Sequence, residues 1–186
     1  MLPSRRLRPN FYPAPAMTDR LMGNAFRDVF FDPSSMTALL RELGDPDMQV
    51  EVLQHAYSLP RRDEAALLRV HNEAGLAREV IMHCQNQPWI YARSFFPHAL
   101  VKANGNHFAR LGPRPLGELL FGNPQVVRSE FSVAKLKPGH LEYHEAAACL
   151  SEKPRHLWAR RSTFHLPDGK LVLTEVFLPA MMAGLL

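Results

Sequence analysis

The sequence predicts an α+β fold, with a single domain and a mainly antiparallel β-sheet. Segments with strand-like alternation outnumber segments with helical spacing, and short turns join them instead of long helical crossovers. The length of 186 residues suits one domain better than two, and a hydrophobic fraction of 46% is enough for one sizeable core. We therefore expect neighbouring strands to pair largely as hairpins.

The N-terminal segment, residues 1–30, is expected to be a loose, basic and Pro-rich tail that precedes a domain over residues 31–186. Its start is basic but lacks the apolar stretch of a secretory signal. No apolar run approaches the roughly 18 residues that a membrane span needs. The prolines and arginines near the start are Pro3, Pro9, Pro13, Pro15, Arg5, Arg6 and Arg8.

Three segments indicate helices. The first lies in DPSSMTALLRELG, residues 32–44, where apolar residues recur at helical spacing. A second is expected over PLGELLF, with Pro115 as its first helical residue, and a third over HLEYHEAAACLSE, residues 140–152. In the first helix the apolar residues are Met36, Leu39, Leu40 and Leu43, Ser34 or Ser35 is the expected cap, and Gly44 is the expected stop.

The remaining regular segments read as strands. Two of them flank CQNQ, a short polar connection that suggests a hairpin although it lacks glycine. Two others flank Pro167-Asp168-Gly169, which is a strong hairpin signal because Asp-Gly suits a tight turn. The predicted strands cover residues 48–57, 76–83, 88–97, 126–136, 156–166 and 170–179.

Two charged residues stand on strand faces that are otherwise apolar. Because side chains alternate along a strand, Arg78 shares its face with Val80 and Met82, and Glu175 shares its face with Leu173 and Phe177. A buried guanidinium needs an anionic partner, and a buried carboxylate must be paired, hydrogen-bonded or protonated. Either Arg78 and Glu175 form an internal ion pair, or they line a polar pocket for a ligand.

Two further motifs carry polar groups of interest. If a helix starts at PLGELLF, the N–H groups of Leu116 and Gly117 are unsatisfied and favour an anion, and Gly117 lets a ligand approach the backbone. The alternative is an ordinary helix start over the core. In WARRS, Arg160 and Arg161 must point to opposite faces of the sheet, where either can form a structural salt bridge.

Several other classes of function are disfavoured. The net charge is +4, but the excess is concentrated in the tail, so no nucleic-acid partner is expected. Two distant cysteines indicate a reducing compartment, and we expect a cytoplasmic protein. His140 and His144 have i,i+4 spacing without an evident third ligand, so no metal is expected. Nucleotide-binding, serine-hydrolase and zinc-protease motifs (P-loop, GxGxxG, GxSxG, HExxH) are not found.

Six segments, in this order, resemble the chorismate pyruvate-lyase (chorismate lyase) family of ubiquinone biosynthesis. They are SMTALL, AREV, PWIYARSFFP, LGPRPLGELLF, WARRS and LTEVFLP, and together they span residues 35–179. The order of PLGxxLF, RRS and TEVFLP makes the set specific. The resemblance implies a monomeric, cofactor-free lyase that converts chorismate to 4-hydroxybenzoate and pyruvate, the first committed step of ubiquinone biosynthesis. It also implies helical flaps over a buried ligand.

The resemblance also implies roles for individual residues. Arg78, within AREV, would hold the ring carboxylate with help from the backbone of Leu116. Glu175, within LTEVFLP, would meet the hydroxyl end of the ring, and Met36 would belong to the first flap. Arg78 and Glu175 are therefore the expected catalytic residues. For the enolpyruvyl carboxylate, three arginines stay open: Arg93, Arg160 and Arg161.

One alternative belongs to a different class of function. The ligand-sensing domains of one family of bacterial transcription regulators resemble the same fold, and such a domain binds an effector without catalysis. Only about 35 residues precede SMT, too few for the winged-helix domain of those regulators. A degenerate lyase that binds 4-hydroxybenzoate without turnover is the other non-catalytic possibility. The chain also departs from shorter family members between Arg128 and Arg160, where the connection is extended.

Overall fold

The computed structural model describes residues 7–14, 24–43, 46–105 and 107–184. Its strands form one sheet in the order β1-β6-β7-β8-β4-β3-β2, and β5 pairs with β7 beside this path. Every pairing between these strands is antiparallel, which confirms the predicted α+β class. The strands are β1 (Tyr12–Pro13), β2 (Gln49–Ser58), β3 (Gly75–Cys84), β4 (Gln87–Pro97), β5 (Val127–Arg128), β6 (Ser132–Leu136), β7 (Leu157–Leu166) and β8 (Gly169–Phe177).

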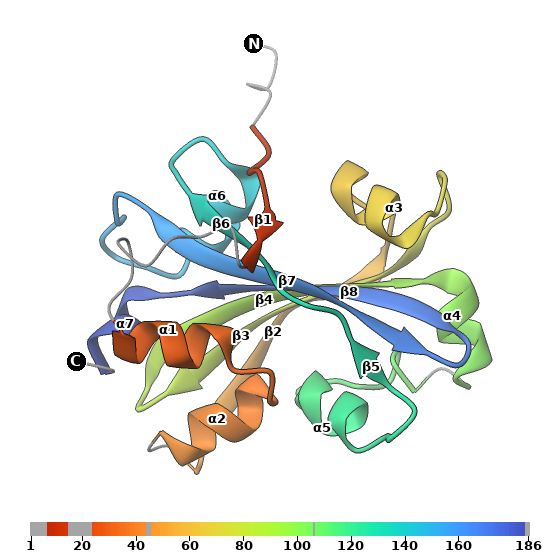
Figure 1. Cartoon of the computed structure of the whole chain (residues 1–186), viewed down its shortest axis with the longest axis horizontal. Helices are drawn as coiled ribbons and strands as arrows, with labels where there is room; N and C mark the ends of the chain where they lie inside the picture. The colour runs from red at the N-terminus through yellow and green to blue at the C-terminus, as the bar shows by residue number, and fades with distance from the viewer. Residues whose placement is uncertain (1–6, 15–23, 44–45, 106, 185–186) are drawn as a thin grey trace.

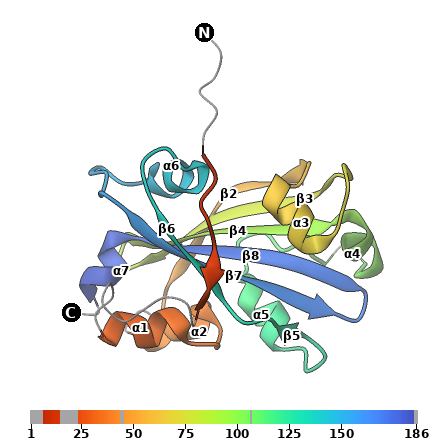
Figure 2. The ribbon, with the colours of Figure 1, turned by 45° about the horizontal axis from the view of Figure 1, so that its top comes forward.

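Short helices cover both faces of this sheet (Figure 1). Helices α1, α2 and α5 lie on one face, which we call the pocket face, and α3 and α6 lie on the other, the back face; a second view shows the same division (Figure 2). The helices are α1 (Asn24–Phe31), α2 (Met36–Glu42), α3 (Arg62–Leu68), α4 (His98–Ala103), α5 (Leu116–Phe121), α6 (Leu141–Ala147) and α7 (Pro179–Gly184). No helix in the described part of the chain is long and apolar enough to cross a membrane.

Both predicted hairpins form. Strands β3 and β4 are joined by Gln85 and Asn86, whose φ angles of 51° and 60° give the left-handed geometry of a tight two-residue turn without glycine. Strands β7 and β8 are joined through Pro167 and Asp168, and Gly169 at the turn has a φ of 149°. The hairpin β3–β4 and the strand β8 therefore lie side by side in the centre of the sheet.

The segment predicted as one strand over residues 126–136 is two strands in the structure. Strands β5 and β6 both pair with β7, and residues 129–131 interrupt them. Ser129 continues the contact because its N–H donates to the Thr163 carbonyl at 2.8 Å. This interruption decides where the side chain of Arg128 points.

Part of the expected N-terminal tail packs on the domain. Strand β1 pairs with β6, and helix α1 buries Phe30, whose ring lies 4.8 Å from that of Phe177. Within the expected tail, backbone groups of β1 therefore pair with the sheet, and the ring of Phe30 packs against it. Residues 1–6 and 15–23 lie outside the described residues.

The expected helix ends are partly correct. Ser35 is the N-cap of α2, but its hydroxyl makes no capping hydrogen bond; instead the Ser34 N–H donates to Asp32 Oδ1 at 2.6 Å. Gly44, the expected stop, lies outside the described residues. Pro115 precedes α5 as its N-cap instead of opening it. Helices α1, α3, α4 and α7, each eight residues or shorter, were not predicted.

Candidate active site

An enclosed pocket, which we call the inner pocket, lies between the sheet and helices α2 and α5. Strands β3, β4 and β8 form its floor, and the two helices form its roof. Its free volume is about 30 Å³, close to the volume of one water molecule. The inner pocket is lined by Ser35, Met36, Thr37, Arg78, Val80, Met82, Ala92, Ser94, Leu116, Gly117, Leu120, Phe121, Arg128, Phe164, Leu173 and Glu175.

All four residues proposed from the sequence line this one pocket. Arg78 comes from β3, Glu175 from β8, Met36 from the start of α2 and Leu116 from the start of α5. Alternation along the strands explains the first two, since Arg78, Val80, Leu173 and Glu175 all point to the pocket face. The structure therefore brings together residues that lie up to 139 positions apart, from 36 to 175.

Arg78 is a buried guanidinium without an anionic partner among the described residues. Its side chain is 2% exposed, and one of its terminal nitrogens, Nη2, donates to the carbonyls of Gly112 and Arg114 at 3.0 Å each. Its Nε is buried and has no hydrogen-bond partner in the described part of the chain. Because burial penalises the charge and no carboxylate compensates, the pKa of Arg78 is lowered to about 10. Such a group favours binding of an anion.

Glu175 is equally buried but pairs with two guanidiniums, mainly through one of its oxygens. Its Oε2 accepts from Arg160 Nε at 2.7 Å and from Arg128 Nη2 at 2.9 Å. Burial alone raises the pKa of this carboxyl, but the two guanidiniums outweigh burial and hold it below its usual value. Glu175 is thus an ionised carboxylate inside the protein, available to accept a hydrogen bond from a ligand hydroxyl.

The internal ion pair between Arg78 and Glu175 that the sequence left open is wrong. Glu175 pairs with Arg128 and Arg160 instead. Alternation places Arg78 and Glu175 on one face, but β4 lies between their strands and Glu175 is opposite Ala92 there. Arg160 also donates from Nη1 to the carbonyls of Phe30 and Asp32, at 2.9 Å each, and so fastens the end of α1 to the sheet.

The three arginines considered for a second carboxylate lie on different faces. Arg160 points to the pocket face, as its pairing with Glu175 shows. Arg93 points to the back face, where it pairs with Glu64 on α3 and with Glu79. Arg161 also points there and pairs with Asp63 of α3. Neither Arg93 nor Arg161 reaches the inner pocket.

Arg128 is the pocket residue that sequence reasoning missed. It comes from the two-residue strand β5, and its Nε donates to Ser162 Oγ at 2.9 Å beside the contact with Glu175. The pairing of Arg128 with Phe164 on β7 depends on the break after β5, which hydrophobic periodicity does not reveal. The one available signal was a cation in a segment predicted as a strand, where Val126 and Glu130 would be its neighbours on the same face.

The roles suggested for two small features change. A Cβ added to Gly117 would overlap the Ser35 hydroxyl, so this glycine lets α5 approach the start of α2. The space beside Gly117 is therefore occupied by Ser35. His140 and His144 accept hydrogen bonds from the backbone N–H groups of Lys137 and Gly139, at 3.1 and 3.2 Å, and so help shape the turn before α6.

Comparison with known proteins shows the family to which the chain belongs. The family model for chorismate lyase matches residues 16–183. The chain belongs to the chorismate lyase family. A protein of Aromatoleum aromaticum named "Probable chorismate pyruvate-lyase" is 36% identical over 173 residues, which cover 91% of this chain and 90% of that protein. A protein of the same name from Pseudoalteromonas translucida is 34% identical over 158 residues, covering 85% and 86%.

Solved structures with a similar fold come from transcription regulators. The effector domain of PhnF from Mycobacterium smegmatis has a TM-score of 0.57 at 11% identity and covers 79% of this chain and 90% of its own. The C-terminal domain of the histidine utilization repressor from Pseudomonas syringae has a TM-score of 0.54 at 9% identity, covering 72% and 93%. At such identities the likeness shows the fold alone. Membership of the chorismate lyase family rests on the sequence match.

Proposed function

We propose that this chain converts chorismate to 4-hydroxybenzoate and pyruvate, in the first committed step of ubiquinone biosynthesis. Arg78 is the observation that carries this function, because it is a buried cation in the inner pocket with no anionic partner among the described residues. Its planar fork suits the ring carboxylate of chorismate, with the Leu116 N–H at the start of α5 as a second donor. The lyase names of its relatives support the same reaction.

Glu175 and the roof of the pocket complete the proposed site. Ionised Glu175 accepts a hydrogen bond from the ring 4-hydroxyl at the end opposite Arg78, and Met36 covers the ring from α2. The free volume of the pocket is too small for a six-membered ring, so α2 and α5 must separate to admit the ligand. When they close again, they exclude water from the ring.

The reaction needs little besides positioning. The C4 proton leaves, and the electrons of the C4–H bond form the C3–C4 double bond of the aromatic ring. The C3–O bond breaks with its electron pair going to the ether oxygen. The released enolpyruvate takes up one proton at its methylene carbon and becomes pyruvate, so that one proton is lost and one is gained. Aromatisation of the ring supplies the driving force, so the chemistry itself calls for no redox cofactor or metal. The protein's part is to hold the ring carboxylate and the hydroxyl and to keep the ring in one orientation. We propose that it acts as a monomer in the cytoplasm.

A turnover assay tests this function against the alternative of a non-catalytic ligand-binding domain. That alternative is considered because domains of transcription regulators have a similar fold. Purified protein with EDTA receives chorismate, 4-hydroxybenzoate is followed by ultraviolet absorbance, and pyruvate is measured separately. We expect both products in equal amounts. Tight binding of 4-hydroxybenzoate without turnover would move the assignment to a non-catalytic ligand-binding domain. Failure of both binding and turnover would remove chorismate and its product as ligands.

A further inference from the structure

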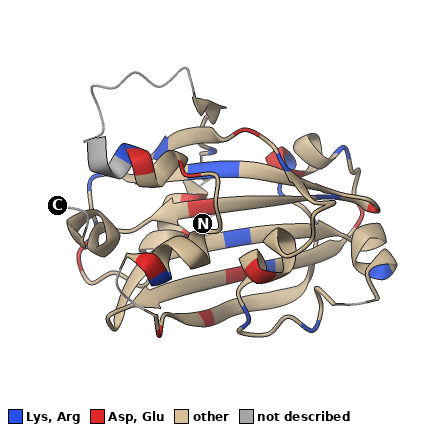
Figure 3. Ribbon diagram, turned by 60° about the horizontal axis from the view of Figure 1, so that its bottom comes forward, with Lys and Arg blue, Asp and Glu red and all other residues tan. Residues whose placement is uncertain are grey.

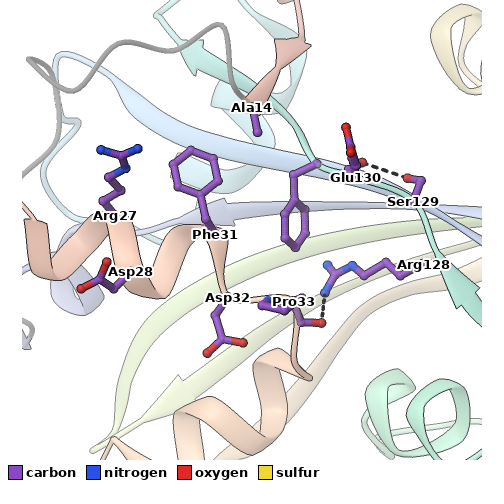
Figure 4. A pocket seen from close by; sticks show the side chains of 10 residues that line it. Ala14, Arg27, Asp28, Phe31, Asp32, Pro33, Arg128, Ser129 and Glu130 are labelled. Atoms are coloured by element: carbon purple, nitrogen blue, oxygen red, sulfur yellow. Dashed lines mark hydrogen bonds between the residues drawn. The ribbon is translucent and has the colours of Figure 1, made fainter.

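A second cavity meets the inner pocket at one side chain, that of Arg128. This cavity, the outer groove, lies between α1, the end of β1 and the segment after β5, and has a volume of about 890 Å³ (Figure 4). Arg128 lines both cavities, and Figure 4 shows it reaching along the groove to the carbonyl of Pro33. The outer groove is lined by Ala14, Arg27, Asp28, Phe31, Asp32, Pro33, Arg128, Ser129, Glu130 and Phe131.

We propose that Arg128 binds the enolpyruvyl carboxylate of the substrate; this inference rests on the proposed function. Chorismate carries two carboxylates, and Arg78 accounts for the one on the ring. The enolpyruvyl ether is attached to the ring carbon next to the one that bears the hydroxyl. A group on that carbon lies beside Glu175, and Arg128 Nη2 is 2.9 Å from Glu175 Oε2.

The buried charges of the pocket face fit a dianion. The inner pocket and its floor hold three guanidiniums, those of Arg78, Arg128 and Arg160. The one carboxylate among them, Glu175, pairs with the last two, which leaves two positive charges over within this group. Asp32 also interacts with Arg128 and Arg160, but it is partly exposed and lines the outer groove, not the inner pocket. Its carboxylate accepts a hydrogen bond from the Ser34 N–H. A ligand with one carboxylate compensates one of the two remaining charges, and a ligand with two compensates both.

Of the two guanidiniums that pair with Glu175, only that of Arg128 lines the outer groove. Arg160 is fully buried and uses Nη1 on two carbonyls at 2.9 Å. Arg128 Nη1 instead donates to the carbonyls of Ser34 and Pro33 at 3.2 and 3.4 Å. Exchange of these long bonds for a bond to a carboxylate is favourable, because a hydrogen bond between two ionised groups is shorter and stronger than one from a cation to a neutral carbonyl.

The test compares two ligands that differ by one carboxylate. 4-Hydroxybenzoate lacks the second carboxylate, and 3-(carboxymethoxy)-4-hydroxybenzoate carries it at the position of the enolpyruvyl ether. Binding of each to the wild type and to Arg128→Gln is measured by calorimetry. We expect the variant to lose at least about 30-fold more affinity for the dicarboxylate than for 4-hydroxybenzoate, as for loss of a buried charge partner. Arg128→Lys, which keeps the charge beside Glu175, should recover part of the difference.

Ser162→Ala is the matched control, because it removes the oxygen that accepts a hydrogen bond from Arg128 Nε without removing the charge. It should weaken both ligands to a similar, small extent. In kinetics, Arg128→Gln should raise the KM for chorismate more than it lowers the affinity for 4-hydroxybenzoate. Equal losses for both ligands would overturn the inference and leave Arg128 as a positioning partner of Glu175.

The experiment distinguishes failure of the role of Arg128 from failure of the proposed function. If Arg128→Gln does not fold, Arg128→Lys decides the question by the same ratio, with equal loss for both ligands again counting against the inference. If the wild type neither turns over chorismate nor binds either ligand, the proposed function fails, whatever Arg128 does. If the wild type turns over chorismate but binds the dicarboxylate no better than Arg128→Gln does, the role of Arg128 alone fails.

Discussion

The two faces of the sheet both bury arginines, but they differ in what lies beside those arginines. On the back face, Arg93 has two carboxylates, those of Glu64 at 2.7 Å and Glu79 at 2.6 Å, and Arg161 has that of Asp63 at 2.7 Å. On the pocket face, a single carboxylate, Glu175, serves two guanidiniums, and Arg78 has none among the described residues. Figure 3 shows charged residues on several strands of the sheet.

This difference separates charges that stabilise the fold from charges that we propose bind a ligand. The back face joins α3 and α6 to the sheet: Arg61 pairs with Glu145, and the buried Glu142 has Arg61 and Arg161 at 3.6 and 4.0 Å. Carboxylates equal or outnumber guanidiniums there, so no anion is needed. The excess of positive charge on the pocket face has a physical cost unless an anion binds, because desolvated cations are unfavourable. A buried cation without a carboxylate partner, Arg78, is therefore the feature that sets the proposed site apart from the back face.

The largest expected effect comes from the one carboxylate that serves two cations. Glu175→Gln leaves Arg128 and Arg160 buried without a negative partner, and we expect the free energy of unfolding to fall by about 3–5 kcal/mol. Urea unfolding of the variant beside the wild type measures the change. A loss below about 1 kcal/mol would mean that the two guanidiniums find other partners and that the ion-pair account of the pocket is wrong.

A smaller loss of stability is expected on the back face. Glu64→Gln removes the carboxylate that accepts both Arg93 Nε and the Arg61 N–H, but Glu79 still pairs with Arg93. We therefore expect a loss of unfolding free energy near or below about 3 kcal/mol, the low end for a broken buried pair. The affinity of the folded protein for 4-hydroxybenzoate should not change, because Glu64 lies on the far side of the sheet. Weaker binding at unchanged folding would contradict the separation of the two faces.

Arg78 should behave in the opposite way. Arg78→Met removes a buried cation that has no carboxylate partner, so unfolding should change by less than about 1 kcal/mol, the scale of its two carbonyl hydrogen bonds. Affinity for 4-hydroxybenzoate should fall by about 2–4 kcal/mol, which is about 30- to 700-fold. Arg78→Lys should restore little, because an ammonium lacks the planar fork.

The same substitution at an exposed position provides the control. Arg62→Met, on the surface of α3, should change neither binding nor stability by a measurable amount. If Arg78→Met instead unfolds the protein while its folded fraction binds normally, Arg78 has a structural role and the pocket assignment fails.

The sequence identified Arg78 and Glu175 as residues of the proposed site, but it did not reveal which side chains pair with Glu175. Alternation along a strand fixes the face of a side chain, and this was enough to place Arg78 and Glu175 on the pocket face. It does not fix which strand is next door, and so the two were considered as a pair although β4 separates them. Arg128 was missed because the break between β5 and β6 follows from tertiary pairing with β7. Glu64 was missed because no helix was predicted over α3, and its partner Arg93 lies on a strand that is distant in the sequence.

The smallest expected effect concerns pH and compares one glutamate from each face. The pKa of Glu175 is lowered, since Arg160 and Arg128 outweigh burial, whereas burial raises the pKa of Glu145 more than Arg61 lowers it. In the unfolded chain both titrate near pH 4.3. Below that pH, unfolded Glu175 takes up protons before the folded group does, so stability falls as the pH decreases toward the folded pKa. Just above pH 4.3, folded Glu145 still holds protons that the unfolded group has released, so stability falls as the pH rises there.

The slope of stability against pH isolates these terms, because it depends only on proton uptake. Glu175→Gln should flatten the slope below pH 4.3, and Glu145→Gln should make the slope just above pH 4.3 more positive, as measured by urea unfolding at closely spaced pH values. Each slope is measured within one protein and then compared between proteins. A loss of stability that is the same at every pH, such as that from a broken ion pair, therefore does not change the slope. Equal slopes in all three proteins would show that neither carboxyl differs between its folded and unfolded pKa. A flattened slope for Glu175→Gln alone would mean that the carboxylate held by two guanidiniums is perturbed and that Glu145, at the more exposed rim of the back face, is screened by solvent.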